Sequence, residues 1–301
     1  MVVKRGLDDK IFDTINTVLM FIVLVVVLYP LYFVVIASIS EPYEVVRGNI
    51  LFLPKGFTLE SYQHVLRNND VWTGYRNTII YTISGTIISL FLTLTSAYAL
   101  SKKRLPGRSF LTWVFLFIMY FNGGLVPTFL LVRSIGLLNQ PHTLIILGAF
   151  SVWNFIVTRT YFQSSIPEEI CESAEIDGAG PLRTFVTIVL PLSAPIIAVM
   201  TLFYAVAQWN SFFNALIYIS NRDYFPLQLI LRNILIVGQT ALSSISEGAD
   251  ASEIEAMARL LQVAQSMRYS LIMIASLPLL IAYTFVQKYF IKGIMIGSLK
   301  G

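Results

Sequence analysis

Glu172-Ser173-Ala174-Glu175-Ile176-Asp177-Gly178 is a short, acid-rich segment between two long apolar runs of a 301-residue chain. Three of its seven residues are acidic, and it is too short and too polar to cross a bilayer. The apolar runs on either side, at about 141–162 and 192–219, are long enough to cross one. The segment therefore predicts a polar helix at a membrane surface, between two transmembrane helices.

Apolar runs of this kind recur along the whole chain. Hydrophobic residues make up 56% of it and charged residues only 13%, about half the charge of a soluble domain. None of the runs has a charged residue near its centre. The predicted spans cover residues 14–38, 77–100, 110–132, 141–162, 192–219 and 269–290. We therefore predict an all-α membrane protein with six transmembrane helices.

Orientation follows from the short loop 102–108, which reads Lys-Lys-Arg-Leu-Pro-Gly-Arg. Lys and Arg in short loops mark the cytoplasmic side. Alternation then predicts that both termini and segment 163–191 are cytoplasmic, and that loops 39–76 and 220–268 lie outside. The basic residues are spread over loop ends and form no groove-sized patch, so we do not expect nucleic-acid binding.

This topology divides the chain into four predicted segments. They are a cytoplasmic N-terminal segment 1–13, a first span with its outer loop 14–76, a core of five spans 77–290, and a cytoplasmic tail 291–301. The core contains both the cytoplasmic loop 163–191 and the long outer loop 220–268. The polar cytoplasmic loop thus has core spans before and after it in the sequence.

The cytoplasmic loop carries the signals of a helix pair. Ser165 and Glu168 have the spacing of a capping box, and Gly178 is the expected left-handed stop. A helix is therefore predicted at about 166–177. A second short helix begins after the next Gly-Pro pair, and we expect Pro191 to end it.

Glu168, Glu172 and Glu175 share one face of the predicted helix. A helix lying on a membrane surface normally carries Lys and Arg on its polar face, and anionic lipid repels acids. A protein partner with a basic surface fits this face better. The alternative is an amphipathic connector at the level of the lipid headgroups.

The wider pattern resembles a known family. Seven positions, of which six match, correspond to the signature loop of the membrane subunits of bacterial ATP-binding-cassette (ABC) importers: Glu172, Ser173, Ala174, Gly178, Ile188, Leu190 and Pro191. The middle residue is alanine in the family signature and serine in this chain. Stretches 120–128, 178–179 and 209–214 are similar to the carbohydrate branch, the maltose-type permeases that take up oligosaccharides and polysaccharides. The resemblance covers nearly the whole chain.

The resemblance implies a type I ABC importer permease in a bacterial cytoplasmic membrane, with these seven residues coupling it to an ATPase. The loop would form a coupling helix that docks in a groove of a separate ATPase subunit, whose closure on ATP turns the permease outward. The implied partners are two ATPase subunits, a second similar permease in a heterodimer, and an extracytoplasmic solute-binding protein. The chain has no phosphate-binding loop, so ATP and Mg²⁺ are expected on the ATPase and no cofactor on this chain.

Polar and aromatic residues inside the predicted spans are candidates for the substrate pathway. They are Asn122, Trp153, Asn154, Tyr204, Gln208, Trp209, Asn210 and Asn214. Uncharged amides and hydroxyls beside aromatic rings suit a sugar. The same groups also hold membrane helices together, so packing remains an alternative for each. Asn122-Gly123-Gly124 predicts a break in the third span, which lines a cavity or is buried in protein.

The outer loop 220–268 contains two further patterns. Segment 226–237 is apolar but too short to cross, which is typical of a re-entrant or interfacial segment. Ser252-Glu253-Ile254-Glu255 has a capping-box form and predicts a helix to about residue 266. The family resemblance implies that this loop meets the solute-binding protein; the alternative is a lid packed on the helices.

Other functions receive little support from the sequence. His64 and His142 are isolated, so no metal site is predicted, and no catalytic set indicates an enzyme. A secondary transporter often uses intramembrane acids or histidines for ion coupling, and the span centres have none. A permease for a solute other than a sugar remains an open alternative.

Overall fold

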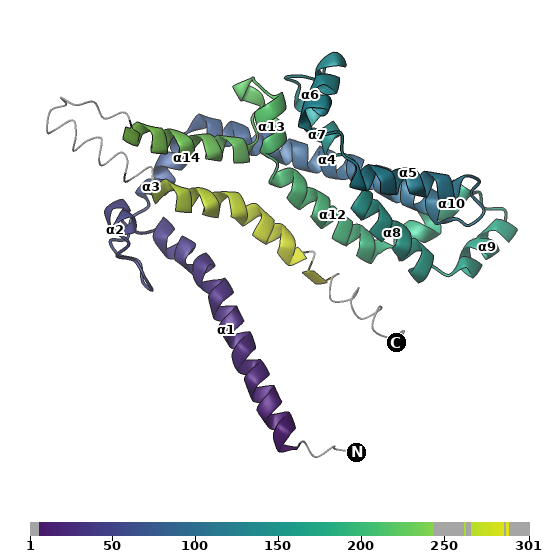
Figure 1. Ribbon diagram of the computed structural model, residues 1–301, viewed down its shortest axis with the longest axis horizontal. Coiled ribbons are helices and arrows are strands. Elements are labelled where there is room, and N and C mark those ends of the chain that lie inside the picture. Colours follow the sequence, from purple (N-terminus) through teal and green to yellow (C-terminus); the bar gives the residue numbers. More distant parts are fainter. Residues whose placement is uncertain (1–5, 244–261, 263–265, 286, 289–301) are drawn as a thin grey trace. The chain divides into compact units, whose positions relative to one another are not determined.

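Figure 1 shows a computed structural model, which describes residues 6–243, 262, 266–285 and 287–288. All regular elements in these residues are helices. The chain divides into two units: Met1–Asn68 with Leu231–Ser276, and Asn69–Ile230 with Leu277–Gly301. Each unit is described by itself.

Unit 1 is built on one long helix. Its helices before residue 69 are α1 (Leu7–Ser38), α2 (Pro42–Val46) and α3 (Glu60–Arg67). Only 6% of the most apolar window of α1 is buried within the chain, as expected of a helix whose side chains face lipid. The end of α1 does pack, because Ile36 and Ala37 join Val45 and Ile50 in a small core. The first predicted span, 14–38, therefore lies entirely within α1.

Unit 2 is arranged around α4 (Asn69–Ser101), which contacts α7, α8, α12 and η2. Its other elements are α5 (Arg108–Tyr120), α6 (Leu125–Ser134), α7 (Pro141–Leu147), α8 (Val152–Ser165), α9 (Glu168–Ile176), α10 (Pro181–Thr184), the π-helix η1 (Phe185–Val189), α11 (Leu190–Leu192), α12 (Ala194–Trp209), α13 (Phe213–Tyr218), the 3₁₀-helix η2 (Arg222–Tyr224) and the start of α14 (Leu227–Ser243). The last candidate span, Ser266–Phe285, is shared by both units.

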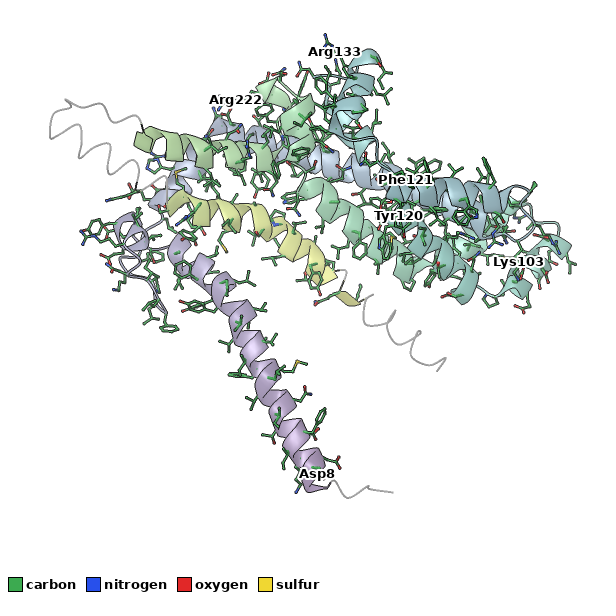
Figure 2. The ribbon with its side chains drawn as sticks, in the orientation of Figure 1. Asp8, Lys103, Tyr120, Phe121, Arg133 and Arg222 are labelled. Atoms are coloured by element: carbon green, nitrogen blue, oxygen red, sulfur yellow. The ribbon has the colours of Figure 1, made fainter. Side chains whose placement is uncertain are left out.

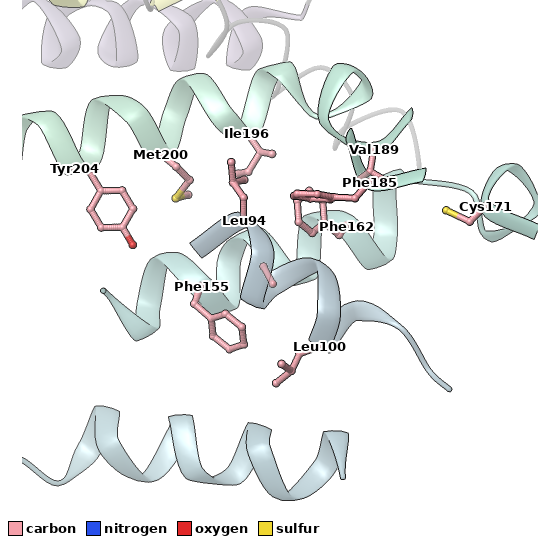
Figure 3. Close-up of a cluster of buried hydrophobic side chains, with 11 residues drawn as sticks. Leu94, Leu100, Phe155, Phe162, Cys171, Phe185, Val189, Ile196, Met200 and Tyr204 are labelled. Carbon is pink, nitrogen blue, oxygen red and sulfur yellow. The ribbon is translucent and has the colours of Figure 1, made fainter. Parts of the chain in front are cut away.

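The largest buried cluster lies where α4, α8 and α12 meet (Figure 3). Leu94 and Leu100 come from α4, Phe155 from α8, and Met200 and Tyr204 from α12. Phe155 and Met200 are completely buried. Lipid tails are as apolar as these side chains, so van der Waals packing within the cluster holds the three helices together.

The described residues contain three helices long enough to cross a membrane alone and three bent pairs, which together give up to six candidate spans. The bend between α5 and α6 is 113°. The sequence predicted this break, and Gly124 has a φ of +89° with its N–H donating to Asn122 Oδ1 at 2.9 Å. Gly124 is the N-cap of α6, and its positive φ, which glycine adopts without strain, turns the chain into this second helix.

Two other predicted spans also consist of more than one helix. Span 141–162 bends by 50° between α7 and α8. Span 192–219 ends as a helix at Trp209 and resumes only at α13. Asn210 contributes to this second break, because its side-chain amide donates to Val206 O at 3.0 Å, a local bond that competes with helix continuation.

The segment after α13 is anchored along the first turns of α4. Asn77 Nδ2 donates to Asp223 O at 2.6 Å and to Phe225 O at 3.1 Å, and Tyr81 Oη donates to Tyr224 O at 3.0 Å. The N–H of Leu227 donates to Thr78 Oγ1 at 2.8 Å. The predicted interfacial segment 226–237 is therefore part of a longer helix, α14, that begins against α4. The helix predicted from Ser252 lies outside the described residues.

Gly74 permits this close contact. A Cβ atom at Gly74 would lie 3.0 Å from Leu227 Cα and 2.6 Å from Ile230 Cδ1. We expect Gly74→Ala to destabilise the fold by about 1–3 kcal/mol, because the Leu227 backbone must shift. Thermal unfolding of the detergent-solubilised protein measures the loss as a lower Tm. Gly123→Ala is the matched control, since its nearest contact would be at 4.0 Å, and an equal Tm for both variants would contradict the close contact.

Candidate functional site

Segment 172–178 forms the C-terminal part of α9 and the turn that follows it. Gly178 has a φ of +80°, its N–H donates to Glu175 O at 3.0 Å, and the N–H of Ala179 donates to Ala174 O at 2.8 Å. These bonds satisfy the carbonyls of the last helical turn. The left-handed stop predicted at Gly178 is therefore present in the structure.

The capping box predicted at Ser165 is wrong. Ser165 is the last residue of α8, and α9 begins at Glu168 with Pro167 as its N-cap and no side-chain cap. Ile166 is extended (φ −107°, ψ 113°), the conformation that a following proline imposes. The two helices are therefore separated at Ile166, and Ser165 does not cap the first turn of α9.

Pro191 also behaves differently from the prediction. It lies inside α11, and the helix ends only at Ser193 before a bend of 83° into α12. Just before it, η1 is a π-helix in which the N–H of Leu190 donates to Phe185 O. A proline clashes with the carbonyl four residues earlier, and a wider turn makes room for its ring. The proline is therefore accommodated and does not end the helix.

The predicted coupling residues differ in their exposure. Glu172, Ser173, Gly178 and Pro191 are exposed, Ala174 is buried, and Ile188 and Leu190 are half-buried. The buried face of α9 consists of Cys171 and Ala174, so α9 lies against the rest of unit 2 through small side chains. The motif thus combines residues that position the loop with residues that face outward.

The acidic face of α9 has partners within the chain. Lys103 Nζ, labelled in Figure 2, lies 2.6 Å from Glu168 Oε2. Arg104 lies 3.5 Å from Glu175 and 3.9 Å from Glu172. The hydrogen bond and charge of Lys103 hold the pKa of Glu168 below its usual range. These acids therefore connect α9 to loop 102–108, and their side chains remain about half exposed.

The sequence analysis missed two exposed apolar residues beside the Gly178 turn. The exposed fraction is 86% for Ile176 and 75% for Leu182. Both side chains therefore extend away from the rest of unit 2, on either side of the turn. The signal was present in the sequence, because Ile176 stands alone between two acids at the end of the predicted helix.

Four of the eight predicted pathway residues are buried within the chain: Asn154, Tyr204, Gln208 and Trp209. Tyr204 Oη lies 2.6 Å from Thr93 Oγ1 and accepts from the N–H of Ser151 at 3.3 Å. Trp209 packs edge-on against Tyr75. These contacts connect α12 to α4 and to the break between α7 and α8.

Gln208 occupies a slot between two glycines. A Cβ at Gly85 would lie 2.7 Å from its Nε2, and a Cβ at Gly148 would lie 2.6 Å from the same atom. Gly148 is the C-cap of α7, and Ser151, three residues later, is the N-cap of α8. The Gln208 side chain therefore fills the space between α4 and this break, where a larger residue in place of either glycine would not fit.

The other pathway candidates are accessible. Asn122, Trp153 and Asn210 are exposed, and Asn214 is half-buried. Asn210 Oδ1 lies 3.5 Å from Gln228 Nε2. All four lie at or beside helix breaks, where backbone groups are also available to a ligand. The structure thus divides the eight candidates into four that are buried within this chain and four that are accessible.

Comparisons with known proteins give a consistent result. The family described as binding-protein-dependent transport system inner membrane component matches residues 71–296. Protein LplC of Bacillus subtilis is 37% identical over 97% of this chain and 96% of its own length. The polygalacturonan/rhamnogalacturonan transport system permease protein YtcP of Bacillus subtilis is 35% identical over 98% of this chain and 100% of its own. A solved bacterial ABC transporter involved in import of the acidic polysaccharide alginate has a chain with a TM-score of 0.82, 31% identity, and coverage of 96% and 100%.

Proposed function

The chain belongs to the family of binding-protein-dependent transport system inner membrane components, and from that premise we propose that it forms half of the translocation pathway of a carbohydrate importer. It is a membrane permease subunit of an ABC importer, a transport component and not an enzyme. The cargo we propose is an oligosaccharide delivered by a solute-binding protein. The names of relatives that transport polygalacturonan, arabinooligosaccharides or alginate support this cargo class.

The α9–Gly178 turn is the observation that carries the coupling part of the proposal. Loop 102–108 holds α9 by ion pairs, Gly178 directs the chain into α10, and Ile176 and Leu182 extend outward on either side. A rigid turn with exposed apolar side chains can transmit the movement of a bound partner to α12. We propose that Glu172, Ser173, Ala174, Gly178, Ile188, Leu190 and Pro191 form this coupling element.

The proposed complex contains two ATPase subunits, a second homologous permease in a heterodimer, and an extracytoplasmic solute-binding protein. ATP and Mg²⁺ belong to the ATPase subunits in this proposal, and this chain binds no cofactor. The accessible residues Asn122, Trp153, Asn210 and Asn214 are proposed to contact the sugar. Amide groups match sugar hydroxyls, and the indole ring of Trp153 offers a face for their C–H groups.

Uptake by the reconstituted complex tests the proposal. The chain, its permease partner and the ATPase are placed in vesicles with the solute-binding protein outside and ATP inside. We expect ATP-dependent entry of a labelled oligosaccharide. Entry driven by a proton or sodium gradient without ATP would support a secondary transporter, and uptake of a non-sugar solute alone would reassign the cargo.

Docking of the ATPase tests the coupling surface separately. We expect Ile176→Asp to weaken binding of the ATPase subunit about tenfold to a hundredfold, because a buried isoleucine contributes about 1.5–3 kcal/mol. Copurification with a tagged ATPase measures the effect. Leu53→Asp is the control, since Leu53 is also exposed (73%) but lies in the loop predicted to be outside. Equal recovery of ATPase with both variants would show that Ile176 is not part of the interface.

A further inference from the structure

A second feature of unit 2 is a small basic pocket between α5 and α8. It has a volume of about 310 Å³ and is lined by Arg108, Ser109, Thr112, Trp113 and Arg159. The two helices pack against each other through Phe115 and Phe155, whose ring centroids are 4.7 Å apart. Arg108 begins α5, and Arg159 lies one turn after Phe155 on α8. Both arginines therefore face one pocket.

The pocket contains positive charge without a matching carboxylate. Nearby Lys103 and Arg104 are paired with glutamates of α9. Neither Arg108 nor Arg159 forms an ion pair within the part of the chain that the structure describes. Arg159 Nε donates to Leu100 O at 3.0 Å, which fixes the guanidinium at the end of α4. Two fixed like charges repel each other, and an anion between them removes that repulsion.

The groups around the pocket suit a phosphate. A guanidinium binds phosphate oxygens through two parallel N–H bonds, and two guanidinium groups can hold one phosphate from both sides. The Ser109 hydroxyl and the first N–H groups of α5 add further donors, and Gly107 at the N-cap supplies no side-chain cap. A carboxylate offers fewer oxygens for this number of donors. The donor set therefore favours a phosphate group.

The surroundings of the pocket indicate where the phosphate comes from. Phe110 and Trp113 are 71% and 72% exposed on the same turn of α5, directly beside the arginines. Exposed aromatic side chains next to basic ones are typical of the membrane–water interface. Loop 102–108 is predicted to be cytoplasmic, and anionic lipids are abundant in that leaflet. We propose that the Arg108–Arg159 pocket binds the phosphate of an anionic phospholipid.

Lipid retention by the intact complex tests this site independently of the cargo. The complex is reconstituted in phosphatidylcholine vesicles with or without phosphatidylglycerol, extracted, and its bound lipids are counted by native mass spectrometry. We expect the extracted complex to retain phosphatidylglycerol in preference to phosphatidylcholine. R108Q/R159Q should bind phosphatidylglycerol about thirtyfold more weakly, from the usual contribution of two arginines near an anionic surface.

Matched variants make the result specific. R183Q removes an exposed arginine of α10 that does not line the pocket, and it should retain phosphatidylglycerol. R108K/R159K keeps both positive charges. Its phosphatidylglycerol binding is measured if R108Q/R159Q does not fold. Unchanged phosphatidylglycerol binding in R108Q/R159Q, or equal loss in R183Q, overturns the proposal. In phosphatidylcholine vesicles, arginine-dependent binding of inorganic phosphate in place of lipid would overturn the lipid source and assign the pocket to free phosphate.

Discussion

Gly178→Val is expected to leave the chain in the membrane and to abolish substrate-stimulated ATP hydrolysis by the reconstituted complex. Gly178 has a φ of +80°, a left-handed conformation that a β-branched residue adopts only with strain. A Cβ at this position would meet no atom within 4 Å, so the cost is conformational and falls on the turn itself. The turn would open, and Ile176 and Leu182 would lose their fixed spacing.

Gly180→Val is the control for this experiment. Gly180 lies two residues further on, has ordinary extended torsions (φ −69°, ψ 163°), and a Cβ there would also meet no atom within 4 Å. Both variants add the same side chain to the same loop, and only one of them requires a left-handed backbone. ATP hydrolysis is measured as phosphate release in the presence of substrate-loaded binding protein. If the complex with Gly178→Val shows normal substrate-stimulated hydrolysis, this turn is not the coupling element.

Asn210→Leu is expected to lower oligosaccharide uptake about tenfold, the effect of losing one good hydrogen bond to a bound hydroxyl. Asn210 is exposed at the break between α12 and α13, so its replacement should lower the Tm less than replacement of a buried residue does. Gln208→Leu should lower both uptake and Tm, because Gln208 is buried between Gly85 and Gly148. Uptake by labelled-sugar filtration and Tm by intrinsic fluorescence separate the two roles.

Asn49→Leu provides the control for a change of an exposed asparagine to leucine. Asn49 is exposed and donates to Glu44 within the loop of unit 1 that is predicted to be outside. Sugar uptake by the complex with Asn49→Leu should equal that of the complex with the unchanged chain. If Asn210→Leu transports sugar at the same rate as Asn49→Leu, Asn210 does not contact the cargo and serves only to end α12.

The sequence predicted features that depend on local composition. The length of the apolar runs predicted up to six spans, and the Asn122-Gly123-Gly124 sequence predicted the break before α6. Gly178 was predicted as a left-handed stop from its place after an acidic helix. Each of these results follows from residues within a few positions of one another.

Features that depend on contacts between distant residues were missed or wrongly predicted. The bend between α7 and α8 involves Gln208, sixty residues beyond Gly148, and hydropathy carries no sign of it. The acids of α9 meet Lys103 and Arg104, which precede them by more than sixty residues. Lining and packing residues have the same chemistry, so only burial separates Asn210 from Gln208. Long-range packing decides these cases.

The break between α7 and α8 has an electrical consequence. Every group that holds it is neutral: Gly148 and Ser151 at the break, Thr93 on α4, and Tyr204 and Gln208 on α12. Moving one elementary charge through the membrane field changes the free energy by about 2.3 kcal/mol per 100 mV, whereas rearranging uncharged amides and hydroxyls moves no gating charge. Any rearrangement of these side chains during transport should therefore be independent of the membrane voltage.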